Sequence, residues 1–411
     1  MSHPQTDPLV DAPPPLDPTG IASLPGRLMD NLRSGNLGSG PVVVALVLIV
    51  LVFSQIADNF FTAVNFNNII LQMAGTTLLA YGVVFVLLIG EIDLSISYVA
   101  GVAGVVVAQL QVPDGSYQIP GLLCIFAAIV AGMLIGAFQG SIVALIGVPS
   151  FVVTLAGFEI WQGVVLKSIP EGVIVIQDET VNNVSQYFFG DTAGWIIAAI
   201  VSLAYLSLTL NGVLQGRRHG VVVRDTALLV AKLIGVPAAA FLTVAICNSD
   251  RGVPFPLLLI IALLLIWTFV AKRTTFGRHV YAVGGNAEAA RRAGINVARI
   301  RIIVFMISGA MAGLGGVVLA SRLSSVDLNA GGGTLLIDGI AAAVIGGTSL
   351  FGGRGEVRNA LFGALVIATI ANGLNTLGYT SGVIFIVTGA ILLFAVTLDT
   401  VARRLQVKAG R

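Results

Sequence analysis

Long apolar runs separated by short polar segments make up most of the chain after residue 40. A helix needs about 20 mostly apolar residues to cross the hydrocarbon core of a membrane. Twelve runs approach that length, and each predicts a membrane-spanning helix: 41–57, 67–90, 92–110, 119–146, 150–168, 193–211, 226–247, 253–271, 301–321, 335–352, 357–376 and 379–399. The glycine-rich run 335–352 can instead form a re-entrant pair of half-helices. The pattern predicts an all-α membrane protein, a polytopic bundle of about 10–12 transmembrane helices.

The composition agrees with this prediction. Of the 411 residues, 56% are hydrophobic and only 10% are charged, and the mean hydropathy is +0.96. Such a chain is far too apolar for a soluble domain of this size, and membrane lipid is its expected surrounding. The formal net charge is only +2, and no nucleic-acid motif occurs, so we expect no nucleic-acid partner.

The two ends of the chain are expected to lie outside the transmembrane domain. Residues 1–38 are rich in proline and have little apolar periodicity, which predicts a disordered cytoplasmic tail. No basic segment precedes a short apolar core there, so we expect no cleaved signal peptide. The transmembrane domain is expected over 39–400, and 401–411 is expected to be a cytoplasmic C-terminal tail.

The basic residues predict the orientation in the membrane. With a cytoplasmic N-terminus, simple alternation places the linker 212–225, the loop 272–301 and the C-terminal tail inside, and all three contain several Lys or Arg residues. The loop 169–192 has four acidic residues and no basic residue, and it falls outside. Alternation therefore agrees with the positive-inside rule. We expect an even number of crossings, with both termini in the cytoplasm.

The basic loop 272–301 contains a segment of good helix formers, from Glu288 to Gly294. Asn286 precedes it and can act as an N-cap, while Glu288 lies in the first turn, where the helix dipole favours a negative charge. Gly294 can take the left-handed conformation that ends a helix. The segment predicts a helix of about two turns outside the membrane. An ordinary positive-inside loop is the alternative interpretation.

Polar side chains within or between the apolar runs are candidates for a transport path, because ionisable groups are costly at membrane depth. The candidates are Glu91, Asp93, Ser95, Glu159, Asp338, Asn372 and Asn375. In the segment 91–95, Asp93 or Ser95 can instead cap the next helix. Glu159 and Asp338 can instead satisfy neighbouring backbone or hydroxyl groups. The two asparagines can instead form hydrogen bonds between helices.

Glycines recur at helix-packing distances. Gly132, Gly136 and Gly140 lie four residues apart, as do Gly309 and Gly313. This small-xxx-small pattern lets membrane helices approach closely. A bundle that rocks against a partner subunit and a bundle that is simply well packed would both use it, and simple packing is the safer interpretation for any one glycine.

Motifs of enzymes are missing from the sequence. No Walker A pattern occurs, and the glycine-rich segment 346–355 has no Lys-Ser or Lys-Thr to complete one. No nucleophile elbow or HExxH signature occurs either. Cys124 and Cys247 lie in apolar runs without paired ligand spacing, and the three histidines are scattered. We therefore expect neither an enzyme nor a metal site, and no cofactor bound by this chain.

Four blocks of the sequence together resemble the sugar-permease family of ATP-binding cassette (ABC) importers, that of the ribose, galactose and xylose systems. These blocks are EIDLS at 91–95, VPSFVVTLAG at 148–157, Gly284-Gly285-Asn286 with Glu288 to Asn296, and AVIGGTSL at 343–350. Their order and spacing match from about residue 40 to 400. The EIDLS form, the insertion around 212–250 and RGVP at 251–254 most resemble the xylose permease subunits. After Ser95 the chain departs from the family's usual Val-Gly-Ser and reads Ile-Ser-Tyr.

The resemblance implies a permease subunit of the bacterial cytoplasmic (inner) membrane, which carries a monosaccharide such as D-xylose or a related pentose. It implies a homodimer with the path at the subunit interface, a periplasmic sugar-binding protein outside and a separate ATPase inside. ATP and Mg would be bound by that ATPase. The ATPase would dock on a coupling helix formed by Asn286, Glu288, Ala289, Ala290, Arg291, Arg292 and Gly294.

Two rival interpretations remain open from the sequence. A proton- or sodium-coupled secondary sugar transporter would use Glu91, Asp93, Glu159 or Asp338 as ion sites, but would leave the helix-forming segment in the loop 272–301 without a task. A membrane scaffold or channel-like pore would explain the glycine spacing and little else.

Overall fold

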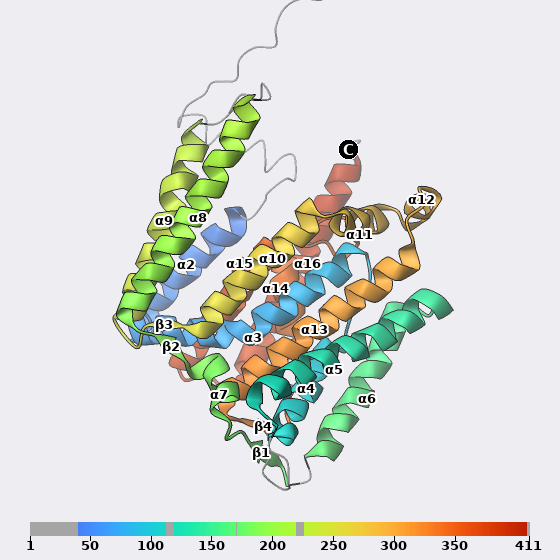
Figure 1. Ribbon diagram of the computed structural model, residues 1–411, viewed down its shortest axis with the longest axis horizontal. Coiled ribbons are helices and arrows are strands. Elements are labelled where there is room, and N and C mark those ends of the chain that lie inside the picture. Colours follow the sequence, from blue (N-terminus) through green and yellow to red (C-terminus); the bar gives the residue numbers. More distant parts are fainter. Residues whose placement is uncertain (1–39, 112–118, 170, 219–225, 409–411) are drawn as a thin grey trace, which may run out of the picture. The chain divides into compact units, whose positions relative to one another are not determined.

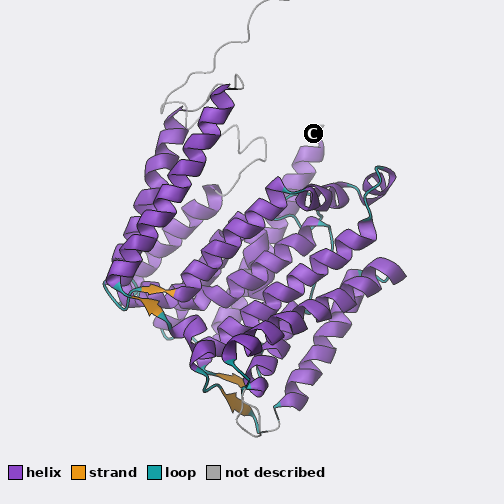
Figure 2. Ribbon diagram, in the orientation of Figure 1, coloured by secondary structure: helices purple, strands orange, loops and turns teal. Residues whose placement is uncertain are grey.

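The computed structural model describes residues 40–111, 119–169, 171–218 and 226–408, and these residues are largely helical (Figures 1 and 2). The predicted tail at 1–38 lies outside the described residues. The described residues form two compact units: a small one with 199–218 and 226–240, and a large one with 40–198 and 241–408. The small unit consists of parts of two helices. All the sites discussed below lie in the large unit.

Eight of the described helices are long and apolar enough to cross a membrane. They are α3 (Ala63–Leu88), α5 (Gly121–Ser141) with its π-helical continuation η2 (Ile142–Ile146), α6 (Ser150–Ser168), α8 (Asp191–Arg218), α9 (Thr226–Asn248), α10 (Phe255–Arg273), α13 (Val297–Leu323) and α15 (Val357–Thr376). Shorter apolar stretches occur in α2 (Gly40–Ile56), α4 (Ile96–Leu110), α14 (Leu335–Ile345) and α16 (Ser381–Lys408). Each predicted run overlaps one of these twelve helices, so the prediction of a polytopic helical bundle is confirmed.

The predicted span 335–352 is wrong in its second half. Helix α14 ends at Ile345, and the following residues form turns rather than another half-helix. Gly347, Gly352 and Gly353 have φ values of +88°, +86° and +72°, which a right-handed helix does not allow. At the C-terminus, α16 continues to Lys408 and so covers most of the segment expected to be a tail.

The short elements of the large unit lie at opposite ends of its helices (Figure 1). One end carries α7 (Glu179–Gln186) and two small antiparallel sheets: β1 (Val173–Val175) paired with β4 (Ser325–Asp327), and β2 (Phe188–Phe189) paired with β3 (Val253–Pro254). The other end carries α11 (Thr275–Gly285) and α12 (Ala287–Arg292). One end therefore carries two small sheets and a short helix, whereas the other carries two short helices.

Helix α13 lies at the centre of the large unit, where it packs against α3, α4 and α5. Its contact with α5 is a seam of glycines. A Cβ atom on Gly309 would lie 2.1 Å from the carbonyl oxygen of Gly132, and one on Gly136 would lie 2.1 Å from that of Phe305. The two backbones touch, and only glycine permits this approach. The close packing predicted from the small-xxx-small pattern is confirmed.

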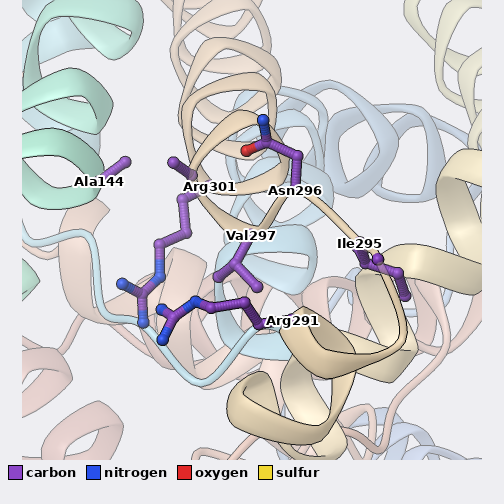
Figure 3. Close-up of a pocket in the computed structure, with 8 residues that line it drawn as sticks. Ala144, Arg291, Ile295, Asn296, Val297 and Arg301 are labelled. Carbon is purple, nitrogen blue, oxygen red and sulfur yellow. The ribbon is translucent and has the colours of Figure 1, made fainter.

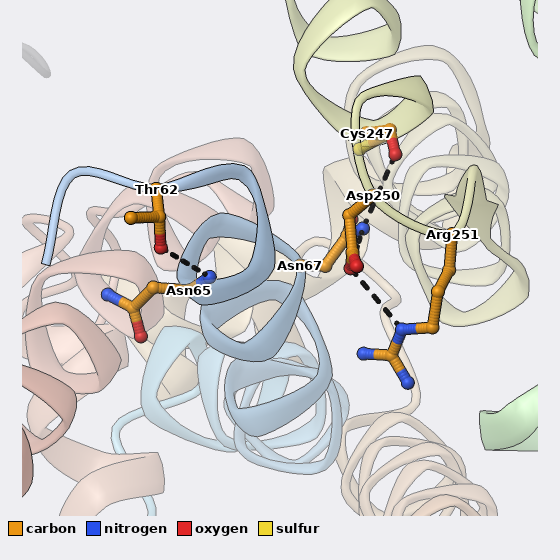
Figure 4. A network of polar contacts seen from close by, with 6 residues as sticks. All are labelled: Thr62, Asn65, Asn67, Cys247, Asp250 and Arg251. Carbon is orange, nitrogen blue, oxygen red and sulfur yellow. Dashed lines mark hydrogen bonds and ion pairs between the residues drawn. The ribbon is translucent and has the colours of Figure 1, made fainter. Parts of the chain in front are cut away.

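Polar contacts tie α3 to the turn after α9 at the end that carries the sheets (Figure 4). Thr62 caps α3 by accepting the amide of Asn65 at 3.2 Å. Asn67 Nδ2 donates to Asp250 Oδ2 at 2.9 Å, and Arg251 Nε lies 3.3 Å from the same oxygen. The hydrogen bond from Asn67 holds the pKa of Asp250 below its ordinary value. These contacts hold the turn between α9 and α10 against the beginning of α3.

Candidate functional site

The helix predicted in the loop 272–301 is present as α12. The Oδ1 atom of Asn286 accepts the amide three residues later at 2.9 Å and so caps the helix. The Glu288 carboxylate in the first turn pairs with Arg291 at 2.9 Å and with Arg292 at 3.2 Å. Gly294 follows the helix with a φ of +83°, the left-handed conformation that glycine adopts without strain. The predicted cap, first-turn carboxylate and terminating glycine are confirmed.

The two sides of α12 differ in exposure. Ala290 is buried and belongs to the main hydrophobic core, so it anchors the helix to the bundle. Glu288, Ala289, Arg291 and Arg292 are exposed. The helix therefore presents one small side chain and three charged ones on a surface that a soluble partner can reach.

A pocket of about 350 Å³ lies where α12 meets α13, and Ala144 of η2 borders it on another side (Figure 3). The side chains of Arg291 and Arg301 both point into it. Each guanidinium has a carboxylate partner, Glu288 for the first and Glu91 for the second. The Nε atom of Arg301 is buried and has no hydrogen-bond partner among the described residues. Two positive groups therefore line a pocket beside the exposed helix.

A non-helical break between α3 and α4 contains three of the predicted path residues. Asp93 is buried, and its Oδ1 atom accepts both the amide of Ser95, at 3.0 Å, and its hydroxyl, at 2.7 Å. Its Oδ2 atom accepts the hydroxyl of Ser308, on α13, at 2.9 Å. The break is thus held by a carboxylate that receives three hydrogen bonds. We call Asp93, Ser95, Ser308 and Gln139 the Asp93 cluster.

Gln139 of α5 completes the Asp93 cluster. Its Oε1 atom lies 2.9 Å from Ser95 Oγ, while its buried Nε2 atom has no partner among the described residues. The Ser95 hydroxyl has one proton, which it can donate to Asp93 or to Gln139 but not to both. Rotation of the Gln139 amide by half a turn would let Nε2 donate to Ser95 Oγ and leave that proton for Asp93. Every member of the cluster would then have a partner.

The alternative role predicted for the segment 91–95 was a cap on the next helix by Asp93 or Ser95. Asp93 accepts the amide of Ser95 next to the beginning of α4, whereas Ser95 itself makes no side-chain capping bond. Glu91 points elsewhere: its Oε1 atom lies 3.0 Å from Nη2 of Arg301. One helix, α13, therefore supplies a partner to both carboxylates of the break.

The other four predicted path residues lie apart from the Asp93 cluster. Glu159 is exposed on α6, and Asn375 is exposed near the end of α15. Asp338 accepts the hydroxyl of Thr334 at 2.7 Å within the first turn of α14. Asn372 is buried, and its Nδ2 atom lies 3.4 Å from Oε1 of Gln72 on α3. The contacts of Asp338 and Asn372 match the alternatives predicted for them, a neighbouring hydroxyl group and a bond between helices.

A second set of contacts links α11 to the turns after α14. The Tyr281 hydroxyl donates to the carbonyl of Gly355 at 2.7 Å, and burial raises the pKa of Tyr281. The amide of Gly353 donates to the carbonyl of Leu88, at the end of α3, at 2.9 Å. A Cβ atom on Gly284 would lie only 1.7 Å from that same carbonyl oxygen. The ends of α3 and α11 and the turns after α14 therefore meet in one place.

Three residues that the structure brings to the break could not be identified directly from the sequence: Arg301, Ser308 and Gln139. Their partners are 44 to 215 positions away, and hydropathy carries no information about such pairs. One signal was available. Arg301 and Ser308 are seven residues apart, which places them on the same face of a helix.

Known proteins match the chain over nearly its whole length. The family model described as "Branched-chain amino acid transport system / permease component" matches residues 65–396, a range that includes the break and α12. The chain belongs to this permease family. The xylose transport system permease protein XylH of Escherichia coli is 37% identical over 374 residues, which cover 91% of this chain and 94% of that protein.

Two further relatives of this permease extend the comparison. The xylose transport system permease protein XylH of Haemophilus influenzae is 35% identical over 376 residues, 90% of this chain and 98% of that protein. The ribose import permease protein RbsC of Escherichia coli is 32% identical over 357 residues, 87% of this chain and 92% of that protein. No solved structure matches the chain. The resemblance to sugar permeases predicted from the sequence blocks is confirmed.

The chemistry available in this permease is hydrogen bonding and charge pairing. Among the described residues, no group of three or more His, Cys, Asp or Glu side chains could hold a metal ion. Cys124 and Cys247 are both buried and free. The Asp93 cluster offers carboxylate, hydroxyl and amide groups, all of them buried, which suit the positioning of helices. With eight long apolar helices among the described residues, the permease is a multi-pass membrane protein.

Proposed function

We propose that this permease is the membrane subunit of an ABC importer that carries a monosaccharide, D-xylose or a related pentose, into the cytoplasm. A separate ATPase subunit drives the transport. The observation that carries the proposal is α12, an exposed helix whose two ends are held by hydrogen bonds. A short connection joins it to α13, and α13 holds the break between α3 and α4. The similarity to xylose and ribose permeases over about nine-tenths of the chain supports the substrate class.

The ATPase docks on α12. The small exposed side chain of Ala289 lets the helix enter a cleft of the partner, while Glu288, Arg291 and Arg292 fix its register through charge. ATP and Mg are bound by the ATPase, and this chain is not itself an enzyme.

Two copies of the permease form a homodimer, with the sugar path at their interface. Glu159 supports this arrangement, because a carboxylate exposed on an apolar helix would be costly against lipid. Its natural neighbours are a second copy or a water-filled path. Glu91, Asp93, Ser95, Asp338, Asn372 and Asn375 are proposed to line or to shape the same path. A neutral sugar needs hydrogen-bonding groups and only weak binding on its way through.

The permease lies in the inner membrane with both termini in the cytoplasm, as the distribution of basic residues predicts. The end with α11 and α12 then faces the ATPase. The end with α7 and the two sheets faces the periplasm, where a sugar-binding protein docks. Exposed apolar side chains on α5, α6 and α10 face lipid or the second copy.

The proposal can be tested with the permease, its ATPase and the binding protein in proteoliposomes. D-xylose uptake and ATP hydrolysis are measured in the same vesicles, with and without the ATPase, and with an ionophore at constant ATP. We expect uptake that requires the ATPase and survives the ionophore. Uptake that continues without the ATPase and collapses with the ionophore would establish a proton- or sodium-coupled transporter instead, the second candidate.

The role of α12 needs its own variant. Glu288→Arg reverses the charge on the exposed face of α12, so it should weaken ATPase binding and reduce sugar-stimulated hydrolysis while the permease stays folded. Glu179→Arg makes the same change on α7, another short helix with an exposed glutamate, at the opposite end of the large unit. It should leave ATPase binding unchanged. If both variants bind the ATPase equally well, α12 is not part of the docking surface.

A further inference from the structure

The connection between α12 and α13 is short and fixed at both sides. The amide of Gly294 donates to the carbonyl of Arg291 at 3.0 Å, and the amide of Ile295 donates to the carbonyl of Ala290 at 3.0 Å. Asn296 then caps α13 by accepting the amide three residues later at 2.9 Å. Only four residues separate the two helices. A displacement of α12 therefore displaces the beginning of α13.

Helix α13 holds the break between α3 and α4 at two points. Arg301 pairs with Glu91 at 3.0 Å, and Ser308 donates to Asp93 at 2.9 Å. The two α13 residues lie on one face of the helix, about 10 Å apart along its axis. Both side chains of the ion pair are more than two-thirds buried, 27% exposed for Arg301 and 14% for Glu91, so water screens the pair less than a surface pair.

The break is held on another side by α6. The amide of Ile92 donates to the hydroxyl of Ser150 at 3.2 Å, and the hydroxyl of Thr154 lies 3.3 Å from the carbonyl of Ile92. Helix α6 also carries the exposed Glu159. A continuous series of contacts thus runs from α12 through α13 and the break to α6.

The glycine seam restricts how α13 can move. Gly309 touches the backbone of α5 at Gly132, just beyond Ser308. The seam continues toward α12 as far as Ile302, beside Arg301, because a Cβ atom on Gly140 of α5 would lie 3.1 Å from the Cα atom of Ile302. A push on α12 would act first on the beginning of α13, and the Arg301–Glu91 pair is the contact with the break that lies nearest to that end of the helix.

We infer that Arg301 is a positioning residue that transmits the movement of α12, through Glu91, to the break and to α6. The inference rests on the proposed function, because it needs an ATPase that moves α12. Loss of the ion pair should leave the ATPase bound and hydrolysing ATP, while less sugar is imported per ATP. A pair that only stabilised the fold would change the amount of folded permease and leave this ratio unaltered.

The test measures D-xylose imported per ATP hydrolysed in proteoliposomes that contain the full chain, its ATPase and the binding protein. Arg301→Gln and Glu91→Gln should each lower the ratio about fivefold without loss of ATPase binding. The double variant Glu91→Arg with Arg301→Glu restores the pair in reverse and should return the ratio to within about twofold of the native value. Arg301→Lys keeps the charge and should preserve most of the ratio, which provides a second variant if glutamine prevents folding.

The control is Lys272→Gln. It breaks another ion pair, Lys272 Nζ with Glu356 Oε1 at 2.6 Å, which joins α10 to the beginning of α15 rather than α13 to the break. Its ratio should equal the native one. Native ratios in both single variants would overturn the inference while ATP-dependent uptake by the native chain upheld the proposed function. A low ratio that the reversed pair does not restore would also overturn it. Absence of ATP-dependent uptake by the native chain would overturn both.

Discussion

Helices α10 and α13 flank the same loop and have nearly the same mean hydropathy, yet their surroundings are opposite. In the most apolar stretch of α13, 61% of the residues are buried, against 17% in α10. Helix α10 exposes Leu265, Ile266 and Phe269. Helix α13 instead packs against three other helices through glycines and Ser308. Hydropathy identifies a helix that can span the membrane, whereas small and polar residues indicate which of these helices lies at the centre of the large unit.

The physical reason lies in the solvent. Lipid chains are as apolar as a leucine side chain, so burial of leucine against another helix gains little in a membrane. Close backbone contact and hydrogen bonds decide which helices pair. Gly309 and Ser308, adjacent on α13, provide one of each. The predictions below compare matched changes on the two kinds of helix.

The largest difference is expected between two identical substitutions. Phe305 of α13 is fully buried, and Phe269 of α10 is 61% exposed. Phe305→Ala opens a cavity in the centre and should reduce stability by about 3–5 kcal/mol, whereas Phe269→Ala should cost less than about 1 kcal/mol. Unfolding of the purified permease in detergent gives both values. Similar losses for the two variants would contradict the difference between the helices.

The glycine seam should be the next most sensitive feature. A Cβ atom on Gly309 meets the backbone of α5, which cannot move aside, whereas one on Gly163 of α6 meets nothing within 4 Å. We expect Gly309→Ala to destabilise the permease by about 2 kcal/mol. Gly163→Ala should be neutral or stabilising by up to about 1 kcal/mol, because alanine favours the helix. The same unfolding assay compares the stabilities of the two variants. A greater loss of stability for Gly163→Ala than for Gly309→Ala would contradict the close contact at the seam.

A smaller effect is expected for the hydrogen bond between α13 and the break. Ser308→Ala removes one of three bonds to Asp93 and should cost about 1 kcal/mol. Ser141→Ala, on α5, removes only a bond from the side chain to the carbonyl of Ala137 within the same helix. That control should change stability by less than about 0.5 kcal/mol. A comparison of the two midpoints of unfolding measures the contribution of the contact between helices.

The smallest effect on stability is expected for the ion pair between Lys272, at the end of α10, and Glu356. Burial alone would raise the pKa of Glu356, but the hydrogen bond from Lys272 and the charges of Arg358 and Lys272 hold that pKa below its ordinary value. The pair therefore stabilises the fold above the unfolded-state pKa of about 4.3, and this contribution is lost as the pH falls through the lower folded-state pKa.

Both members of that pair are partly exposed, so Lys272→Gln should cost less than about 0.5 kcal/mol at neutral pH. The difference between native and variant permease should vanish in acid, below the pKa of Glu356 in the folded state. Thermal unfolding of both proteins over a series of pH values checks this. A difference that grows as the pH falls would contradict the assigned sign.

Local features of the fold could be predicted from the sequence because they depend on neighbouring residues. The cap at Asn286, the end of α12 at Gly294 and the suitability of the glycines of α5 and α13 for close helix packing each follow from a short pattern with a known conformational preference. The place of the helices in the membrane follows from apolar length. The span 335–352 was predicted too long because its second half is apolar enough to suggest a helix, although its glycines take left-handed conformations.

The contacts between distant segments could not be predicted. Glu91 and Arg301 are each ordinary charged residues at the edge of an apolar run, and only the packing of α13 brings them together. Asp93 was predicted as a candidate, but its partner Ser308 lies 215 positions away. Glu159 was grouped with these residues because all interrupt apolar runs, yet it is exposed on α6. The face of an apolar helix that contacts other helices depends on how the helices pack, and local sequence patterns do not reveal that packing.

The central claim is that α12 carries the movement of the ATPase into the membrane, and a distance measurement tests it most directly. A spin label on Ala289→Cys, with the buried Cys124 and Cys247 replaced by serine, reports one distance between the two α12 helices of a homodimer. We predict that this distance shortens when ATP closes the ATPase in the reconstituted complex, and that Arg301→Gln leaves the shortening intact while sugar import per ATP falls. A distance that does not change on ATP binding, in a complex that still imports D-xylose, would contradict the account.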